Sequence, residues 1–514
     1  MTNSESSTQK LPPNPHEHHE ILPGENLAAN KLGIAGVVFF VVAAAAPLVG
    51  MTGAVPVAIV LGNGAAAPGA YLAVGLILLI FSVGYAAMSS QVSNAGAFFA
   101  YVGRGLGIVP GVGSAFVSLF AYLTIQLAIF GFFGGLASFQ LNEKLGTNLN
   151  WWTWALIAWA LVTILSILQV DIGAKVLGVL MILEVASLTL MAVAVIAHGG
   201  GPDGFALAAS FSPSKIFAGG FSGSAGIALA FAFASYIGFE ATAIYAEETK
   251  NPKRAVPIAT YTAVILIAVL FAITSWAVVS GVGSNSVVDK VAEQSGGLAD
   301  PAAVIFGVAE EYVGGWLATT MSWLVLSSLF AGLLAFQNSA ARYFFSLGRA
   351  GVLPKALDHV NGRGAPLVGA LATSTVTGAV IAWFAATGKD PVLNLFYWFS
   401  AVAVLAIVLV EILVSVSVIM HFRRSGGGGV WSTMIAPIIS IVGLIIGAYL
   451  VMARFGLLAG TTAEGVDPTT QTFGLSTFGW ILVLSPFIVF LLGLVVGAVR
   501  RSEENADAVA DLVT

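Results

Sequence analysis

The stretch Val41-Val-Ala-Ala-Ala-Ala-Pro-Leu-Val-Gly-Met-Thr-Gly-Ala-Val-Pro56 decides the fold, because this long apolar run cannot form an uninterrupted helix. Pro47 removes a backbone hydrogen-bond donor and strains the helical turn that precedes it. Gly50, Thr52 and Gly53 follow within six residues of the proline. We therefore expect a helix that unwinds near Pro47–Gly53 and leaves backbone amides and carbonyls free at the break.

A second stretch has the same character and reads Phe231-Ala-Phe-Ala-Ser-Tyr-Ile-Gly-Phe-Glu-Ala-Thr-Ala-Ile-Tyr-Ala246. Gly238 lies at its centre, between Ser235 and Glu240. This pattern predicts a break at Ser235–Phe239 and a second patch of free backbone groups. The alternative interpretation is that the small residues only allow close packing between helices in a membrane.

The whole chain is too apolar for a water-soluble protein. Of its 514 residues, 58% are hydrophobic and 9% are charged, whereas soluble domains carry about 25% charged residues. About 20 apolar residues cross a bilayer as a helix, which satisfies its own backbone groups. The apolar runs predict an all-α membrane protein with about twelve spans, at Gly33–Val60, Gly69–Val92, Ile108–Gln140, Trp151–Gln169, Ala174–Ala197, Phe221–Ala246, Ala255–Gly281, Trp316–Phe345, Ala365–Ala386, Leu393–Phe422, Val430–Phe455 and Phe478–Val499.

The order of the spans suggests internal repetition. The two interrupted runs are the first and the sixth, and that spacing is expected for two inverted five-helix repeats. This spacing favours interrupted helices over the alternative that the small residues only allow close helix packing. The predicted divisions are a polar tail at 1–30, a first repeat at 31–200, a second repeat at 201–424, two further helices at 425–501 and a tail at 502–514.

The basic residues predict an orientation. With twelve spans, 15 of the 20 Lys and Arg residues lie on the side of both termini and 5 on the other. Cytoplasmic loops carry the excess of basic residues, so both termini are expected in the cytoplasm. The polar segment Met1–Asn30 has no apolar core typical of a cleaved signal peptide, so the first span should act as an uncleaved signal anchor.

Several classes of site are disfavoured. The chain has no cysteine, and it has no basic surface pattern typical of nucleic-acid binding. The cluster His16–Glu20 lacks the His-Glu-x-x-His spacing of a zinc helix. We expect no metal centre and no cofactor.

Three carboxylates fall inside apolar runs, namely Glu184, Glu240 and Glu411. A carboxylate at the bilayer centre costs at least about 2.5–3.5 kcal/mol, so each is a candidate for function. Glu240 adjoins the break in the sixth span and is the strongest of the three. Such a group can take up and release a proton, although each could instead make a buried hydrogen bond that only stabilises its helix.

Neutral polar residues add further candidates. Ser327 and Ser328 lie in the middle of the eighth span, where their hydroxyls could help to bind a cation facing the first helix. Serine also hydrogen-bonds its own helix, which is the alternative role. Tyr122, Gln126 and Trp398 could line or gate a pocket.

Three motifs resemble those of the amino acid–polyamine–organocation (APC) superfamily of permeases. They are Asn94–Arg104 after the second span, Tyr236–Glu240 with Glu247–Pro257 around and after the sixth, and Asn338–Pro354 after the eighth. The resemblance implies a leucine-transporter-like fold with two inverted repeats, and transport by alternating access. It also implies that the carboxylate and amine of a substrate bind backbone groups at the breaks of helices one and six.

The resemblance and the breaks together give a predicted site. The predicted substrate-binding residues are Ala46, Pro47, Gly50, Met51, Thr52, Gly53, Tyr122, Ser235, Tyr236, Ile237, Gly238, Phe239 and Glu240. The predicted ion-coupling residues are Glu240, Glu184, Ser327 and Ser328. Two features depart from the family pattern: Met51-Thr52-Gly53 replaces a Gly-Ser-Gly type of sequence, and Glu184 lies at or near a position where some members carry lysine.

The implied function is a secondary active permease in the cytoplasmic membrane, since the chain has no phosphate-binding loop. The expected substrate is an amino acid or related amine, and the first choice of coupling ion is H⁺, with Na⁺ as the alternative. A polyamine or amine importer, an exchanger, and a sensor that has lost transport remain as other hypotheses. An intramembrane enzyme is disfavoured, because the spans carry no paired catalytic groups.

Overall fold

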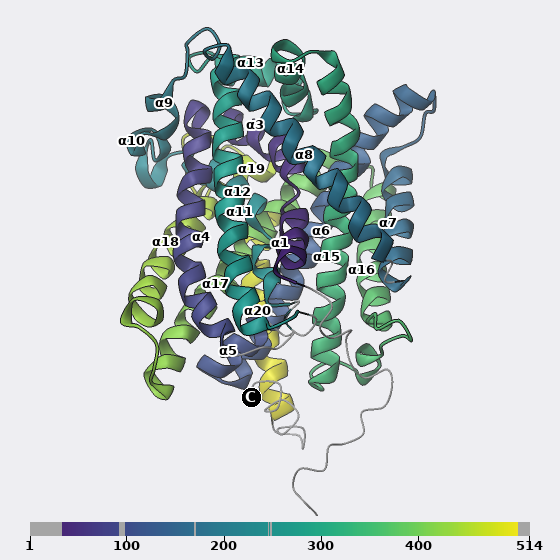
Figure 1. Cartoon of the computed structure of the whole chain (residues 1–514), viewed down its shortest axis with the longest axis vertical. Helices are drawn as coiled ribbons and strands as arrows, with labels where there is room; N and C mark the ends of the chain where they lie inside the picture. Colours follow the sequence, from purple (N-terminus) through teal and green to yellow (C-terminus); the bar gives the residue numbers. More distant parts are fainter. Residues whose placement is uncertain (1–32, 92–97, 169–170, 245, 247–248, 502–514) are drawn as a thin grey trace, which may run out of the picture.

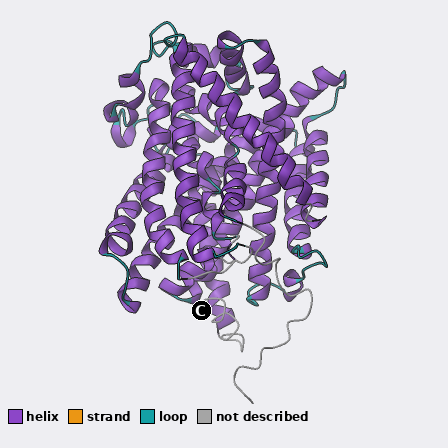
Figure 2. Ribbon diagram, in the orientation of Figure 1, coloured by secondary structure: helices purple, strands orange, loops and turns teal. Residues whose placement is uncertain are grey.

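A computed structural model describes residues 33–91, 98–168, 171–244, 246 and 249–501. The predicted tails at 1–30 and 502–514 lie outside the described residues, as do the His16–Glu20 cluster, the first residues of the Asn94–Arg104 motif and Glu247. Within the described ranges the fold is a bundle of long helices, and the only β-type pairings are three isolated bridges (Figures 1 and 2). The prediction of an all-α fold is confirmed.

The helices follow the predicted apolar runs. Their bounds are α1 Ile34–Ala45, α2 Pro47–Val49, α3 Val55–Val57, α4 Ala67–Ser89, α5 Phe98–Leu106, α6 Ile108–Leu145, α7 Trp151–Leu168, α8 Asp171–Ala197, α9 Leu207–Phe211, α10 Pro213–Ile216, α11 Ala225–Tyr236, α12 Pro252–Val282, α13 Val287–Gln294, α14 Ala302–Tyr312, α15 Gly315–Arg349, α16 Leu367–Ala386, α17 Tyr397–Ser425, α18 Ala436–Ala453, α19 Phe455–Ala459 and α20 Thr477–Arg501.

Eleven helical segments of the described chain are long and apolar enough to cross a membrane, against twelve predicted spans. The difference lies at the first break. One of the eleven, Pro47–Ser89, joins the second half of the first predicted span to α4, and the backbone between them is non-helical at Gly62. The first half of that span is α1, which is too short to count by itself. With α1 and the segment Pro47–Asn63 taken as one interrupted span, the two descriptions agree.

The helix α6 is the central element of the bundle. It packs against α5, α7, α15, α17 and α20, and most of its side chains are buried. Glycines allow the closest of these contacts, since a Cβ on Gly493 of α20 would lie 2.7 Å from the Cα of Gly113. The outer helices expose apolar side chains such as Ile182, Leu491 and Val495, as expected for surfaces that face lipid.

The two ends of the bundle differ. The short helices α9, α10, α13 and α14 lie at the upper end in Figure 1, while α5 and the end of α20 lie at the lower end. The segment between α12 and α15 forms two amphipathic helices, α13 and α14, and α14 packs against the π-helical turn η1 (Gly50–Ala54). The upper end therefore covers the second half of the first span.

Candidate functional site

The first span breaks at Ala46, one residue before Pro47. Helix α1 ends at Ala45, Ala46 has left-handed backbone angles (φ 42°, ψ 72°), and α2 begins at Pro47. A proline disfavours helical angles in the residue before it and supplies no N–H, so the helix cannot continue through this point. A positive φ at a residue with a Cβ is strained, so the surrounding structure must hold Ala46 in this conformation.

The sixth span breaks at Ile237 and Gly238, inside the predicted interval Ser235–Phe239. Helix α11 ends at Tyr236, Ile237 is extended in ψ (127°), and Gly238 has φ 114°. A short 3₁₀ turn, η5 (Phe239–Thr242), follows. Only glycine adopts such backbone angles without steric strain, so Gly238 permits the break. The prediction that helices one and six are discontinuous is confirmed.

The two breaks touch each other. A Cβ on Gly238 would lie 2.7 Å from the Cβ of Ala44, and a Cβ on Gly50 would lie 3.2 Å from Ser235 Oγ. Any larger side chain at either glycine would push the two segments apart. The fold therefore brings together two stretches of interrupted backbone that are far apart in the sequence.

Glu240 stabilises the second break from inside the bundle. Its Oε2 accepts a hydrogen bond from the Gly238 N–H at 3.0 Å, and its Oε1 accepts one from the Tyr122 hydroxyl at 2.8 Å. The Tyr85 hydroxyl donates to the Glu240 carbonyl at 2.6 Å. The side chain is 1% exposed. Both carboxylate oxygens thus have a donor, and the group ties α6 and α4 to the broken end of α11.

A small buried cavity of about 40 Å³ lies beside the two breaks. It is enclosed by the first span, α6, α11, α15 and the start of α17. From the predicted set, Ala46, Gly50 and Ser235 line it, and further walls come from Ile125, Ile129, Phe231, Phe336, Phe396 and Ser400. We call this space the central cavity. A space of this size holds a water molecule and is far below the roughly 300 Å³ of a typical ligand pocket.

Two hydroxyls line the central cavity, and they differ in their bonding. Ser235 Oγ donates to the Phe231 carbonyl of its own helix at 2.8 Å. Ser400 Oγ is buried and finds no hydrogen-bond partner in the described part of the chain. Ser400 therefore keeps its full hydrogen-bonding capacity at the cavity wall.

The remaining residues of the predicted substrate site pack around the breaks without lining the central cavity. Thr274 donates to Met51 Sδ, Thr52 donates to the Leu48 carbonyl, and Tyr236 donates to the Tyr71 carbonyl. The Met51 contact holds the first span against α12, the Tyr236 contact holds α11 against α4, and the Thr52 bond lies within the first span. Pro47, Gly53, Ile237, Gly238 and Phe239 are likewise buried there, and their part in substrate binding stays a prediction.

Glu184 lies near the first break, beside Leu48. It is 2% exposed, although its neighbour Ile182 on α8 is 64% exposed toward the lipid side. The Glu184 carboxylate lies close to the backbone N–H of Leu48 and to the Ser328 hydroxyl, which makes no hydrogen bond among the described residues. The first N–H groups of a helix have no acceptor within the helix, so the carboxylate supplies an acceptor that α2 itself lacks. Glu184 and Ser328 are neighbours in the fold, and their part in ion coupling stays a prediction.

Ser327 and Glu411 have different surroundings. Ser327 Oγ donates to the Leu324 carbonyl of its own helix at 2.7 Å, as serine in a helix often does. Glu411 on α17 is 1% exposed, and its Oε2 has no hydrogen-bond partner among the described residues. Glu411 is close enough to Glu240 for the two carboxyl groups to interact electrostatically.

No group of three or more His, Asp or Glu residues in the described ranges is arranged to hold a metal ion.

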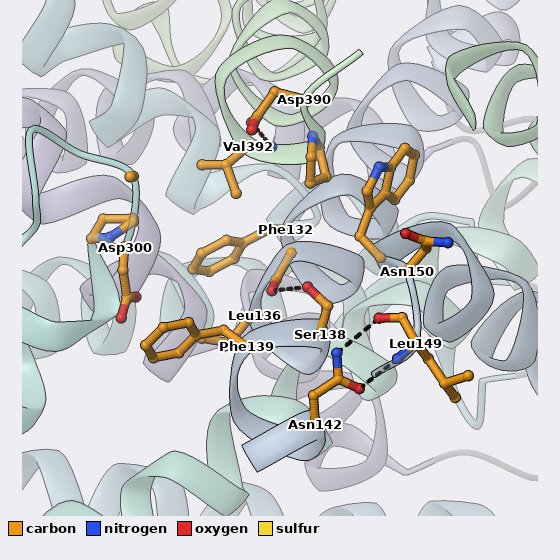
Figure 3. A pocket seen from close by; sticks show the side chains of 15 residues that line it. Phe132, Leu136, Ser138, Phe139, Asn142, Leu149, Asn150, Asp300, Asp390 and Val392 are labelled. Carbon is orange, nitrogen blue, oxygen red and sulfur yellow. Dashed lines mark hydrogen bonds between the residues drawn. The ribbon is translucent and has the colours of Figure 1, made fainter. Parts of the chain in front are cut away.

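Figure 3 shows a second, larger cavity of about 480 Å³, and its wall at Ala299–Pro301 lies between α13 and α14, at the upper end of the bundle in Figure 1. Its polar lining includes Asn142, Asn150, Asp300 and Asp390, and Phe132 forms part of its wall. Asp390 accepts hydrogen bonds from the N–H groups of Val392 and Leu393 and so caps the turn η8 (Pro391–Phe396). Burial raises the pKa of the Asp300 carboxyl. We call this space the vestibule.

Two stacked aromatic rings join the lining of the vestibule to the lining of the central cavity. Phe132, which lines the vestibule, stacks on Phe396, which lines the central cavity, with ring centroids 4.9 Å apart and planes at 18°. Gly53 leaves room for both rings, because a Cβ there would lie 2.9 Å from Phe132 and 3.2 Å from Phe396. The stacked pair, from α6 and η8 and next to the first span, is thus a candidate for an aromatic barrier between the two spaces.

The sequence model described as Amino acid permease matches residues 36–496 of the chain. The chain belongs to the amino acid permease family. Among its relatives, this permease is 26% identical to the amino-acid permease GAP5 of Candida albicans, over 54% of this chain and 44% of the relative. It is 28% identical to the branched-chain amino acid permease BcaP of Lactococcus lactis, over 32% of this chain and 34% of the relative.

A third relative is the histidine permease of Saccharomyces cerevisiae, 26% identical over 55% of this chain and 46% of the relative. The permease therefore spans less than half the length of these curated relatives. The printed names of the three relatives refer to amino acids in general, to branched-chain amino acids and to histidine, so together they do not indicate one substrate.

Sequence reasoning missed most of the walls of the permease's central cavity. Ile125, Ile129, Phe336 and Phe396 are apolar residues in apolar helices, so nothing in their type separates them from residues that face lipid. Ser400 is one of three serines in the tenth predicted span, and only the tertiary packing leaves its hydroxyl without a hydrogen-bond partner among the described residues. The one feature of the sequence that could have indicated Ser400 as a cavity residue is its polar side chain inside an apolar run.

Proposed function

We propose that this permease carries an amino acid across the cytoplasmic membrane by alternating access, with the substrate held at the two helix breaks. The observation that supports this most is the contact between the breaks, Gly238 against Ala44 and Gly50 against Ser235, at the wall of a buried cavity. Interrupted helices offer free amides to a carboxylate and free carbonyls to an ammonium group. An α-amino acid carries both groups on one carbon.

The two cavities suggest a route for the substrate. It enters the vestibule, passes the stacked rings of Phe132 and Phe396, and reaches the central cavity. Since the central cavity is too small for an amino acid in this conformation, the walls and the aromatic pair must move when substrate binds. With both termini in the cytoplasm, the vestibule faces outward and the direction of transport is import.

Coupling to protons is the preferred source of energy, and Glu184 is the proposed carrier of the proton. Its carboxylate lies against the Leu48 N–H at the first break and beside Ser328. Protonation of Glu184 would weaken the attraction to that N–H and so change the stability of the break. Glu240 is proposed to stabilise the backbone conformation of the second break by accepting the hydrogen bond from the Gly238 N–H. Sodium coupling is the alternative, with Glu184 and Ser328 as ligands.

The test is counterflow uptake in proteoliposomes with a panel of labelled amino acids and polyamines, with and without pH and sodium gradients. We expect at least one amino acid to exchange without any gradient and to accumulate when the outside is more acidic. Accumulation with sodium alone would favour the alternative. If no compound is taken up under any gradient, transport is refuted and a sensor with this fold is favoured.

A further inference from the structure

The walls of the central cavity carry no charged side chain among the described residues. The two buried carboxylates at the helix breaks have other partners, and neither they nor Glu411 line the cavity. Glu240 accepts hydrogen bonds from Tyr122 and Gly238, and Glu184 lies against Leu48 and Ser328. A cationic side chain or a polyamine in this cavity would therefore form no ion pair with a residue of its walls.

The walls away from the two breaks are apolar. They are formed by Ile125 and Ile129 of α6, Phe336 of α15 and Phe396 beside α17. Each of these side chains is at most 6% exposed. If the breaks hold the ammonium and carboxylate groups of the substrate, these walls surround its side chain. Because the cavity is small, a compact substrate side chain fits after fewer wall residues move than a large one does.

Ser400 is the exception in this apolar surface. Its hydroxyl is 3% exposed, lines the central cavity and has no partner in the described chain. A buried hydroxyl without a partner is unfavourable, so one that persists at a cavity wall is explained if a ligand supplies the missing bond. The hydroxyl both donates and accepts, so it can bind either polar end of an amino acid.

We propose that the central cavity selects neutral amino acids with compact apolar side chains, and that Ser400 Oγ hydrogen-bonds the bound substrate. This inference rests on the proposed function, because it assumes that the substrate's charged groups bind at the breaks. It excludes cationic amino acids and polyamines, since an uncompensated charge in this environment would lower uptake by about 100-fold.

The first experiment compares alanine, valine, leucine, phenylalanine, lysine and putrescine in proteoliposome counterflow. Valine or leucine should be transported with kcat/KM at least about 100-fold above that of lysine, and putrescine should not be transported. Transport of lysine or putrescine as efficient as that of leucine would overturn the inference and leave the permease function intact. Failure of every compound would refute the proposed function itself.

The second experiment changes the cavity wall. In Ile129→Ala the ratio of kcat/KM for phenylalanine to that for valine should rise by about tenfold, because the truncation leaves room for a larger side chain. The matched control is Ile182→Ala on the lipid-facing side of α8, which should leave the ratio unchanged. If Ile129→Ala does not fold, Ile125→Ala serves the same purpose. An unchanged ratio in an active variant contradicts the assigned wall.

The third experiment removes the free hydroxyl. In Ser400→Ala the KM for the best substrate should rise by about tenfold, because one buried hydrogen bond to the ligand is lost. The melting temperature without substrate should stay the same or rise, since the hydroxyl has no partner to lose. The rise in melting temperature on adding substrate should become smaller. An unchanged KM, or a lower melting temperature without substrate, would overturn the role of Ser400.

Discussion

At the scale of single residues, Glu240 depends on remaining an acceptor at both oxygens. Oε1 receives the Tyr122 hydroxyl and Oε2 receives the Gly238 N–H, so there is no place for a donor. In Glu240→Gln the amide nitrogen would face one of these donors, and a clash of this kind costs about 1–3 kcal/mol. We expect transport to fall by about 10- to 100-fold or to lose its coupling, measured by counterflow and accumulation in proteoliposomes.

A suitable control for that variant is Glu310→Gln on the amphipathic helix α14, where the side chain is exposed. It carries the same chemical change away from the breaks and should transport normally. Fully coupled transport in Glu240→Gln, at the rate of the unchanged protein, would refute the role given to this carboxylate.

Glu184 is expected to separate exchange from accumulation. In Glu184→Gln the side chain can no longer gain and lose a proton, but its carbonyl can still accept from the Leu48 N–H. Labelled substrate should therefore still exchange across the membrane, while a pH gradient should no longer concentrate it. Undiminished accumulation would rule out Glu184 as the proton carrier.

The neighbouring serines give a matched pair for the same site. Ser328→Ala removes the hydroxyl beside Glu184 and should alter the pH or sodium dependence of uptake, whereas Ser327→Ala removes a hydroxyl bonded within its own helix and should not.

At the scale of whole elements, the first break was predicted at Pro47–Gly53 and lies one residue earlier, at Ala46, whereas the residues from Pro47 to Ala54 are helical. Proline and glycine act on the backbone directly, so their effect at Pro47 and Gly238 could be read without knowledge of the packing. The position of Ala46 follows from the proline rule, but its left-handed angles depend on the surrounding helices. The cavity walls were not predictable, because burial toward a cavity and burial toward another helix select the same apolar residues.

The conformation of Ala46 leads to a prediction about stability. Glycine tolerates a positive φ, so Ala46→Gly should relieve strain and stabilise the permease by about 1 kcal/mol. The matched change Ala45→Gly, inside α1, should destabilise it by about 1 kcal/mol, because glycine weakens a regular helix. Thermal unfolding in detergent compares the two variants. Equal shifts of the same sign would show that Ala46 is not strained.

The aromatic barrier can be tested by its permeability. The chain has no cysteine, so Ala234→Cys places one reactive thiol at the wall of the central cavity. Adding Phe132→Ala removes a ring that stacks on Phe396, and a stack of this kind is worth about 0.5–1.5 kcal/mol beyond its buried area. We expect modification of the thiol by a membrane-impermeant maleimide to become about tenfold faster.

Phe130→Ala provides the comparison for this experiment. Phe130 is also a buried phenylalanine of α6 and lines neither the vestibule nor the central cavity. It should leave the labelling rate almost unchanged. Equal acceleration by both variants would indicate general loosening of α6 rather than the opening of a barrier.

At the scale of the whole molecule, the number and order of the spans were accessible from hydropathy, since each crossing needs its own run of apolar residues. The contact between the first and sixth spans was not accessible in this way. It depends on three-dimensional closeness of Ala44 to Gly238 and of Gly50 to Ser235, which no local pattern specifies. The family resemblance, rather than composition, suggested that these spans meet.

The orientation of the molecule is a further prediction. Single cysteines at the exposed positions Asn148, between α6 and α7, and Gly427, after α17, should lie on opposite sides of the membrane. In intact cells an impermeant maleimide should label Asn148→Cys and leave Gly427→Cys unlabelled, because basic loops stay in the cytoplasm. Both should react after solubilisation in detergent. The reverse pattern would place the vestibule in the cytoplasm.

The contact between Gly238 and Ala44 also has an evolutionary consequence. With only 2.7 Å between the Ala44 Cβ and a Cβ placed on Gly238, the two positions share room for a single methyl group. A mutation that enlarges one of them can be accepted only after the other has been reduced. Gly238 cannot be enlarged without strain at its φ of 114°, so in permeases that descend from the same ancestor position 238 should stay glycine and position 44 should stay alanine or glycine.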